Sequence, residues 1–117
     1  MNPLLKIGAL YELQDYNILS RADILKAVAE EYELTPEDLI NNKTRAPEYA
    51  IPRHVYAYLC RELTDFKLVK IGDYINKNHA TIIHSVKSMH DYIRFDKILK
   101  KRVSNIRIKL KQRTCTQ

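Results

Sequence analysis

Apolar residues recur at intervals of three and four along most of the chain, and strand-like alternation is absent over any useful length. This spacing predicts helices over residues 21–33, 52–63, 68–75 and 94–111, and another that begins near residue 79. A short helical turn after Pro36 and a weaker helix at 3–16 complete the pattern. Ser20, Thr35 and Asn78 stand at the starts as capping residues. The pattern predicts an all-α fold, a compact domain of about five to six helices.

The inward face of each predicted helix follows from the same spacing. The expected core positions are Leu25, Val28, Ala29 and Tyr32, then Val55, Leu59 and Leu63, then Leu68, Ile71 and Ile75, then Ile82, Ile83, Val86, Met89 and Ile93, and finally Ile98, Leu99, Val103, Ile106 and Leu110. The helices at 68–75 and from 79 are separated by a short turn, which is the spacing of a helix-turn-helix. Gly72 is one of only two glycines. Because it has no Cβ, we expect it to let the second helix of this pair approach the first closely.

Length and composition favour one soluble domain. The 117 residues are 45% hydrophobic and 29% charged, as in ordinary globular proteins. We divide the chain into an N-terminal segment at 1–19 whose pattern is too weak to assign, a helix-turn-helix domain at 20–112 and a flexible tail at 113–117. No apolar run approaches the length of a membrane span, and no signal-peptide cleavage site follows the N-terminal residues. The two cysteines, Cys60 and Cys115, do not have the spacing of a CxxC motif. We therefore expect a cytoplasmic protein.

Charge is unevenly distributed within the net +6. Residues 1–42 hold three Lys/Arg against eight Asp/Glu, a net charge of −5, whereas residues 94–117 hold nine against one, a net charge of +8. Such a basic portion suits a polyanion such as nucleic acid, because Lys and Arg displace counterions from phosphates. A solvated helix face explains the same charge equally well, so both interpretations stay open on charge alone.

The start of the helix from residue 79 carries side chains suited to reading duplex DNA. In a helix-turn-helix the first turn of the second helix faces the base edges of the major groove. Asn78, His79, Ala80 and Thr81 lie there, and His84 and Lys87 follow further along. Asn pairs with adenine through two hydrogen bonds, His and Thr donate or accept, and the methyl groups of Ala and Thr suit thymine.

Three segments resemble a known family in their order and content. They are ILKAVAEEYELTPEDL at 24–39, IPRHVYAYLCRELT at 51–64, and LVKIGDYI with NHATIIHSV within 68–86. Residues 24–110 are similar to the C-terminal DNA-binding domain of the bacterial replication initiator DnaA, a helical domain of Trp-repressor-like type. The resemblance implies sequence-specific binding of double-stranded DNA, in replication initiation or its regulation, or in transcription regulation.

The resemblance also assigns contact roles. The family's base-reading Asp-His-Thr-Thr falls on residues 78–81, its preceding basic residue on Lys77, its minor-groove arginine in the loop with Lys43 and Arg45, and a phosphate contact on Arg53. The expected base contacts are Asn78, His79, Ala80, Thr81 and Arg45, and the expected backbone contacts are Lys43, Arg53, Lys77, Lys87 and His84.

This chain departs from the family's pattern in three places. Asn78 and Ala80 replace the Asp and the first Thr, the turn at Asn76 is one residue shorter, and the loop near Arg45 is one residue longer. We therefore expect the docking mode to be retained, and two targets stay open: sites like the family's DnaA box, or a different preferred DNA sequence.

Enzymatic function is disfavoured. The chain has no GxxxxGK[ST], so the initiator's ATPase chemistry is not expected, and neither a cofactor nor a metal is predicted. His79, His84 and His90 are spaced five and six apart, unlike the two histidines of a zinc HExxH motif. The alternative function is a protein-interaction adaptor that binds a partner through the acidic N-terminal part and has lost sequence-specific reading. Monomeric and dimeric states both stay open.

Overall fold

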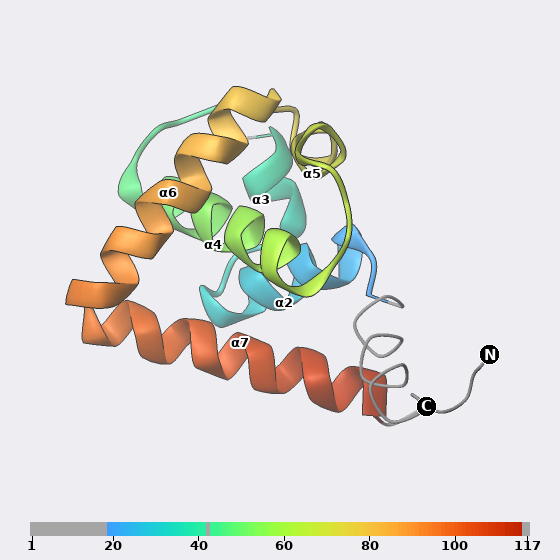
Figure 1. The fold of residues 1–117 in the computed structure, drawn as a ribbon, viewed down its shortest axis with the longest axis vertical. Helices are drawn as coiled ribbons and strands as arrows, with labels where there is room; N and C mark the ends of the chain where they lie inside the picture. Colours follow the sequence, from blue (N-terminus) through green and yellow to red (C-terminus); the bar gives the residue numbers. More distant parts are fainter. Residues whose placement is uncertain (1–18, 42, 116–117) are drawn as a thin grey trace.

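Six helices follow one another in the part of the chain that the computed structural model describes, residues 19–41 and 43–115, with side chains as far as residue 112. They are α2 (Arg21–Glu31), α3 (Pro36–Asn41), α4 (Pro47–Leu63), α5 (Leu68–Tyr74), α6 (His79–Phe95) and α7 (Lys97–Cys115) (Figure 1). No strand occurs among these residues, so the predicted all-α class is confirmed. The helix expected at 3–16 lies outside the described residues, and α7 includes residues 113–115 of the expected tail.

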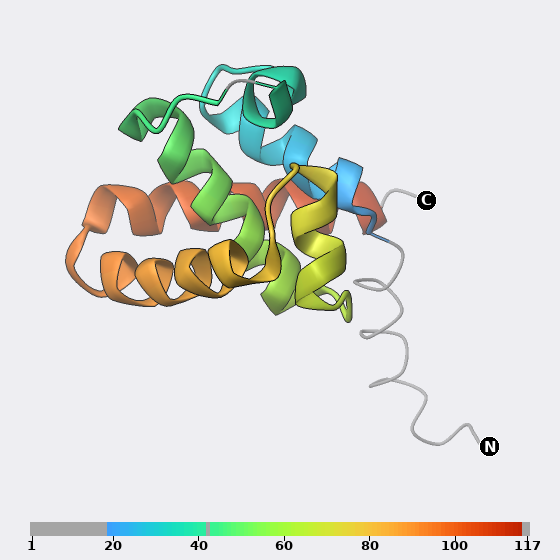
Figure 2. The same ribbon diagram turned by 90° about the horizontal axis from the view of Figure 1, so that it is seen from above.

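α4 is the central helix of the fold. It packs against α2, α3, α5 and α6, and the two perpendicular views place it among them (Figures 1 and 2). Its predicted stripe of Val55, Leu59 and Leu63 is buried. Tyr56, the residue after Val55, is also fully buried, and its hydroxyl donates to the carbonyl oxygen of Ile71 in α5 at 2.8 Å. This hydrogen bond satisfies a polar group that burial would otherwise leave unpaired, and burial raises the pKa of Tyr56.

The start of α4 was predicted wrongly. The helix begins at Pro47 and continues through Pro52, which we expected to open it. Pro47 occupies the first helical position, where a missing N–H costs nothing, and the amides of Tyr49 and Ala50 bond to the carbonyl oxygen of Ala46. Both prolines satisfy the start rule, so local sequence does not choose between them.

The turn between α5 and α6 is closed by backbone hydrogen bonds. The amide of Lys77 donates to the carbonyl oxygen of Gly72 at 2.9 Å, and that of Asn76 to Asp73 at 3.3 Å. Asn76 takes a left-handed conformation with φ of 60°, which Asn tolerates better than most residues. Asn78 then caps α6, because its Oδ1 accepts from the amide of Thr81 at 2.9 Å. The turn therefore fixes where α6 begins and which way its first turn faces.

The absence of a side chain at Gly72 is required by this turn. A Cβ there would collide with the carbonyl oxygen of Lys77, and it would lie 3.1 Å from Cγ1 of Ile82 in α6. The expected close approach of α6 is confirmed. The nearest obstacle, however, is the backbone of the turn itself.

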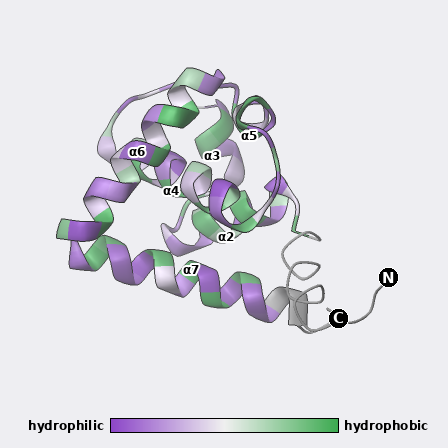
Figure 3. Ribbon diagram, in the orientation of Figure 1, coloured by the Kyte–Doolittle hydropathy of each residue, from purple (hydrophilic) through white to green (hydrophobic). Residues whose placement is uncertain are grey.

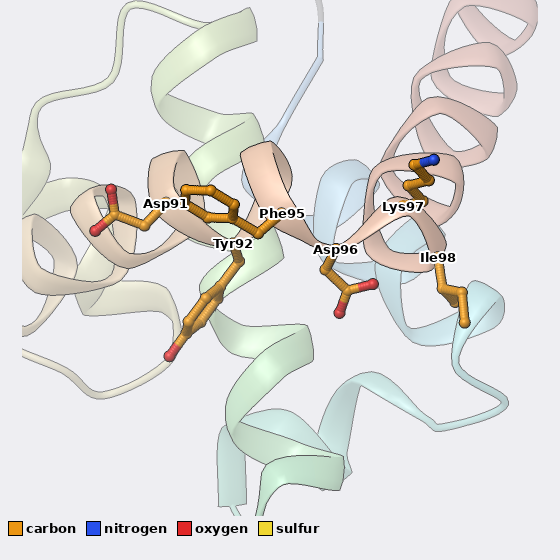
Figure 4. A pocket seen from close by; sticks show the side chains of 6 residues that line it. All are labelled: Asp91, Tyr92, Phe95, Asp96, Lys97 and Ile98. Atoms are coloured by element: carbon orange, nitrogen blue, oxygen red, sulfur yellow. The ribbon is translucent and has the colours of Figure 1, made fainter.

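The junction of α6 and α7 also differs from the prediction. Asp96 interrupts the helix, and its Oδ1 accepts from the amide of Leu99 at 3.0 Å, which caps α7. Leu99, Val103, Ile106 and Leu110 are buried as expected, but Ile98 is 74% exposed and Phe95 82%. Ile98 comes one position before the buried stripe, which places it about 100° around α7 from Leu99, so it faces solvent. An open hollow of about 720 Å³ lies at this corner, lined by Asp91, Tyr92, Phe95, Asp96, Lys97 and Ile98 (Figure 4).

Two arginines of α7 make contacts with other helices of the same molecule. Arg102 donates to the carbonyl oxygen of Glu31 at 3.0 Å and lies over the ring of Tyr32. Arg107 binds both carboxylate oxygens of Glu62 at 2.8 and 2.9 Å, which raises the pKa of the arginine. Hydrophilic residues predominate along this helix (Figure 3). Part of the basic C-terminal charge therefore meets acidic residues and carbonyls of α2 and α4.

Replacing Gly72 with Ala tests the constraint at the turn. Helix propensity alone would stabilise α5 by about 1 kcal/mol, but the collision with the turn reverses the sign. We expect the free energy of unfolding to fall by about 1–3 kcal/mol, measured by urea denaturation. Lys70→Ala on the exposed side of α5 is the matched control and should change it by less than about 0.5 kcal/mol. A Gly72→Ala protein as stable as the control would contradict the steric argument.

Candidate nucleic-acid interface

Two hollows lie between the loop before α4 and the start of α6. The first, of about 380 Å³, is lined by five of the residues predicted from sequence, Arg45, Arg53, Lys77, Thr81 and His84, and by His54 and Ser85 among others. The second, of about 360 Å³, lies between the loop and the turn and is lined by residues that include Lys43, Arg45, Asn76 and Lys77. Arg45 and Lys77, which are 32 positions apart, line both. Tertiary folding therefore gathers Lys43, Arg45 and Lys77 at one end of α6.

The first turn of α6 presents its side chains to solvent. His79, Ala80 and Thr81 are exposed, and Asn78 is exposed at the cap. The N-terminal end of a 17-residue helix carries a partial positive charge, which adds to that of the neighbouring cations. This end of α6 is suited to a polyanion that also offers groups for hydrogen bonding.

Arg53 occupies a different environment from the one its predicted phosphate contact requires. Its side chain is only 7% exposed. Its Nε donates to the carbonyl oxygen of Leu39 at 2.8 Å, and its Nη1 to that of Thr44 at 2.9 Å. Burial lowers the pKa of Arg53 from its usual high value. The residue ties α4 to the end of α3 and to the loop that carries Lys43 and Arg45.

His54 and Ser85 form a contact that we did not predict. Nδ1 of His54 lies 2.8 Å from Oγ of Ser85, and the rings of His84 and Tyr92 lie 6.2 and 6.4 Å from that of His54. Ser85 is buried within the apolar side of α6, where its hydroxyl requires a partner. A serine three positions after Ile82 and four before Met89 is the sequence signal that would have pointed to a buried hydroxyl in need of a partner. The pKa of His54 is lowered, first by burial and then by the positive charges of His84 and Arg53.

Three predicted backbone contacts are exposed, and two of them, Lys43 and His84, also line the hollows. Lys43 is exposed on the loop, and Lys87 and His84 are exposed on α6. Nε2 of His84 is 3.5 Å from Oγ of Ser88, at the limit of a hydrogen bond. Lys87 lines neither hollow, although it lies on the same helix two turns after the cap.

Other chemistry finds little support in the described part of the chain. No group of three or more His, Cys, Asp or Glu side chains there could hold a metal ion. Cys60 is a free, fully buried thiol, and burial raises its pKa to about 12, so it stays protonated and is a poor nucleophile. Among the same residues, no helix is both long and apolar enough to cross a membrane.

Comparisons with known proteins identify relatives of this region. Residues 22–89 match the family model described as the bacterial dnaA protein helix-turn-helix. Proteins named chromosomal replication initiator protein DnaA are similar: that of Oenococcus oeni is 37% identical over 98 residues, covering 83% of this chain and 22% of the relative. The protein of Deinococcus radiodurans is 38% identical over 73% of this chain and 18% of its own length. The protein of Lacticaseibacillus casei is 41% identical over 81% of this chain and 21% of its own length. The chain spans about a fifth of the length of these relatives.

Arg53→Lys tests the positioning role of the buried guanidinium. A lysine keeps the charge, but its single ammonium cannot replace Nε and Nη1 toward two carbonyl groups. We expect the free energy of unfolding to fall by about 1–3 kcal/mol in urea denaturation. Arg61→Lys, an exposed position on the same helix, is the control and should remain within about 0.5 kcal/mol of wild type. Equal losses of stability in the two variants would argue against a positioning role for the two Arg53 hydrogen bonds.

The lowered pKa of His54 predicts a loss of stability in mild acid. In the unfolded chain the His54 imidazole has a pKa of about 6.5, and in the folded chain its pKa is lower. As the pH drops through about 6.5, the unfolded chain therefore binds a proton before the folded chain does, and the free energy of unfolding falls. His54→Gln removes this contribution, and its melting temperature should fall less than that of wild type between pH 7.5 and 5.5. His79→Gln, at an exposed ring outside the hollow, is the matched control. An unchanged pH dependence in His54→Gln would contradict the assignment.

Proposed function

Because this chain belongs to the bacterial dnaA helix-turn-helix family, we propose that it binds duplex DNA in a sequence-specific manner. α5 and α6 are the two helices of the motif, and α6 lies in the major groove with its first turn toward the base edges. The observation that carries this proposal is the convergence of Lys43, Arg45 and Lys77 around the two hollows beside that turn. The exposed polar first turn reads sequence while the neighbouring cations hold the backbone.

The proposed base contacts are Asn78, His79, Ala80 and Thr81 in the major groove and Arg45 in the adjacent minor groove. The His79 imidazole both donates and accepts, and the methyl groups of Ala80 and Thr81 suit the thymine methyl. Arg45 is exposed on the loop that Arg53 anchors at Thr44. An anchored loop favours binding, because less conformational entropy is lost when Arg45 enters a narrow groove.

The proposed phosphate contacts are Lys43, Lys77, Lys87 and His84. Lys77 lies immediately before the cap of α6, where its ammonium adds to the positive end of the helix dipole. For Arg53, the buried hydrogen bonds favour a positioning role, with any phosphate contact made through its small exposed part.

Several biological roles are consistent with a sequence-specific DNA-binding protein. We propose that it acts in the cytoplasm, in replication initiation or its regulation, or in the regulation of transcription. Because the chain spans only about a fifth of its relatives, the activity of the complete initiator is not part of this proposal. An adaptor that binds a protein partner through its acidic N-terminal part is the alternative.

Substitutions at His79 and Lys77 separate base reading from backbone binding. A preferred duplex is first selected from a randomised pool, and fluorescence anisotropy then measures binding to it and to a random duplex at two salt concentrations. His79→Ala should cost about 1–3 kcal/mol on the preferred duplex and little on the random one. Lys77→Ala should weaken both alike and reduce the log-log salt slope by about 1.

Lys26→Ala on α2, which lines neither hollow, is the charge-matched control for Lys77→Ala. Equal losses on preferred and random duplex for His79→Ala would remove its assigned role. No binding to any duplex at low salt would instead favour the protein-interaction adaptor.

A further inference from the structure

The two terminal atoms of the Asn78 side chain, Oδ1 and Nδ2, lie in different environments. Oδ1 accepts from the backbone amide of Thr81 at 2.9 Å, so the carbonyl side of the group is used at the end of α6. The residue is exposed, with extended backbone at φ of −83° and ψ of 170°. Because the carboxamide is planar, an Oδ1 directed at the helix end leaves the Nδ2 amino group on the opposite side. That group carries two N–H donors and no lone pair for accepting a hydrogen bond.

The cap therefore limits which bases Asn78 can recognise. The two-bond pairing of Asn with adenine requires Oδ1 to accept from N6 while Nδ2 donates to N7. The Thr81 amide occupies one lone pair of Oδ1 and holds the carbonyl side of the group toward the end of α6, which disfavours the first of these bonds. Sequence alone suggested this adenine pairing, and the capped geometry disfavours it.

We propose that Asn78 acts in the major groove as a hydrogen-bond donor that selects guanine and rejects cytosine at one position of the DNA site. Guanine presents two adjacent acceptors there, O6 and N7, whereas cytosine presents the donor N4. This inference rests on the proposed function, and it specifies which base is preferred at one position of the DNA site. Adenine offers N7 alone, so it ranks between the two.

The acidic counterpart of Asn78 would have the opposite polarity with the same cap. An ionised Asp caps a helix about as well as Asn does, and its second oxygen accepts hydrogen bonds only. With one oxygen on the Thr81 amide, the other is available to accept from N4 of cytosine. Asn78→Asp therefore changes the hydrogen-bonding role of the outward atom while the start of α6 stays in place.

The test compares three proteins, wild type, Asn78→Asp and Asn78→Ser, by selection from a randomised duplex pool. Each variant is then measured by fluorescence anisotropy on four duplexes that differ only at the position where the selected sequences diverge. Wild type should bind the guanine duplex about tenfold more tightly than the cytosine duplex, as expected for one hydrogen-bond contact. Asn78→Asp should reverse that preference, and Asn78→Ser, which keeps a capping hydroxyl, should bring the ratio close to one.

Asn78→Asp also adds a negative charge near the phosphates, which lowers affinity for every duplex, so the ratio between duplexes is the measured quantity. Circular dichroism melts check that all three proteins are folded. His79→Ala is the matched control, because it should alter a different base position and leave this one unchanged.

The outcomes separate this inference from the proposed function. A wild type that selects adenine at this position, or an Asn78→Asp protein that selects the same sequence as wild type, overturns the donor role while sequence-specific binding stands. A wild type that selects no sequence at all overturns both.

Discussion

The backbone of the turn between α5 and α6 comes too close to Gly72 for any side chain there. A Cβ would collide with the carbonyl oxygen of Lys77 and press on Ile82, so the tight turn and the packing of α6 depend on the same missing atom. The turn in turn sets the cap at Asn78, and the cap determines which atoms of the first turn face outward. The position of the exposed first turn of α6 therefore follows from a steric constraint at Gly72, nine positions before Thr81.

Buried polar groups place the other half of the interface. Arg53 is inside the molecule with its donors on the carbonyl oxygens of Leu39 and Thr44, which fixes the path of the loop between α3 and α4. His54 and Ser85 join α4 to α6 beside the same hollow. Because unpaired buried donors and acceptors are costly, these contacts favour a single arrangement of loop and helix. Exposed cations on that loop can then approach a ligand from a defined direction.

The basic C-terminal part of the sequence contributes part of its charge to contacts between helices. Arg102 and Arg107 of the basic last helix bind Glu31 and Glu62, so part of the C-terminal charge holds α7 against α2 and α4. Such contacts are partly exposed and each contributes little stability, but they occupy cations that composition alone would assign to nucleic acid. Lys43, Arg45 and Lys77, in contrast, line the hollows beside the exposed first turn of α6.

The all-α class, the approximate helices, the caps at Ser20 and Asn78 and the exposed first turn at residues 79–81 can be predicted from the amino-acid sequence, because they depend on periodicity and on hydrogen bonds between residues three or four positions apart. The packing of the helices, in contrast, sets the start of α4 at Pro47, the exposure of Ile98 and the burial of Arg53. Local rules allowed more than one answer at each of these positions. The contact between His54 and Ser85 spans 31 positions, and such pairs are set by how helices pack against one another, which no local pattern encodes.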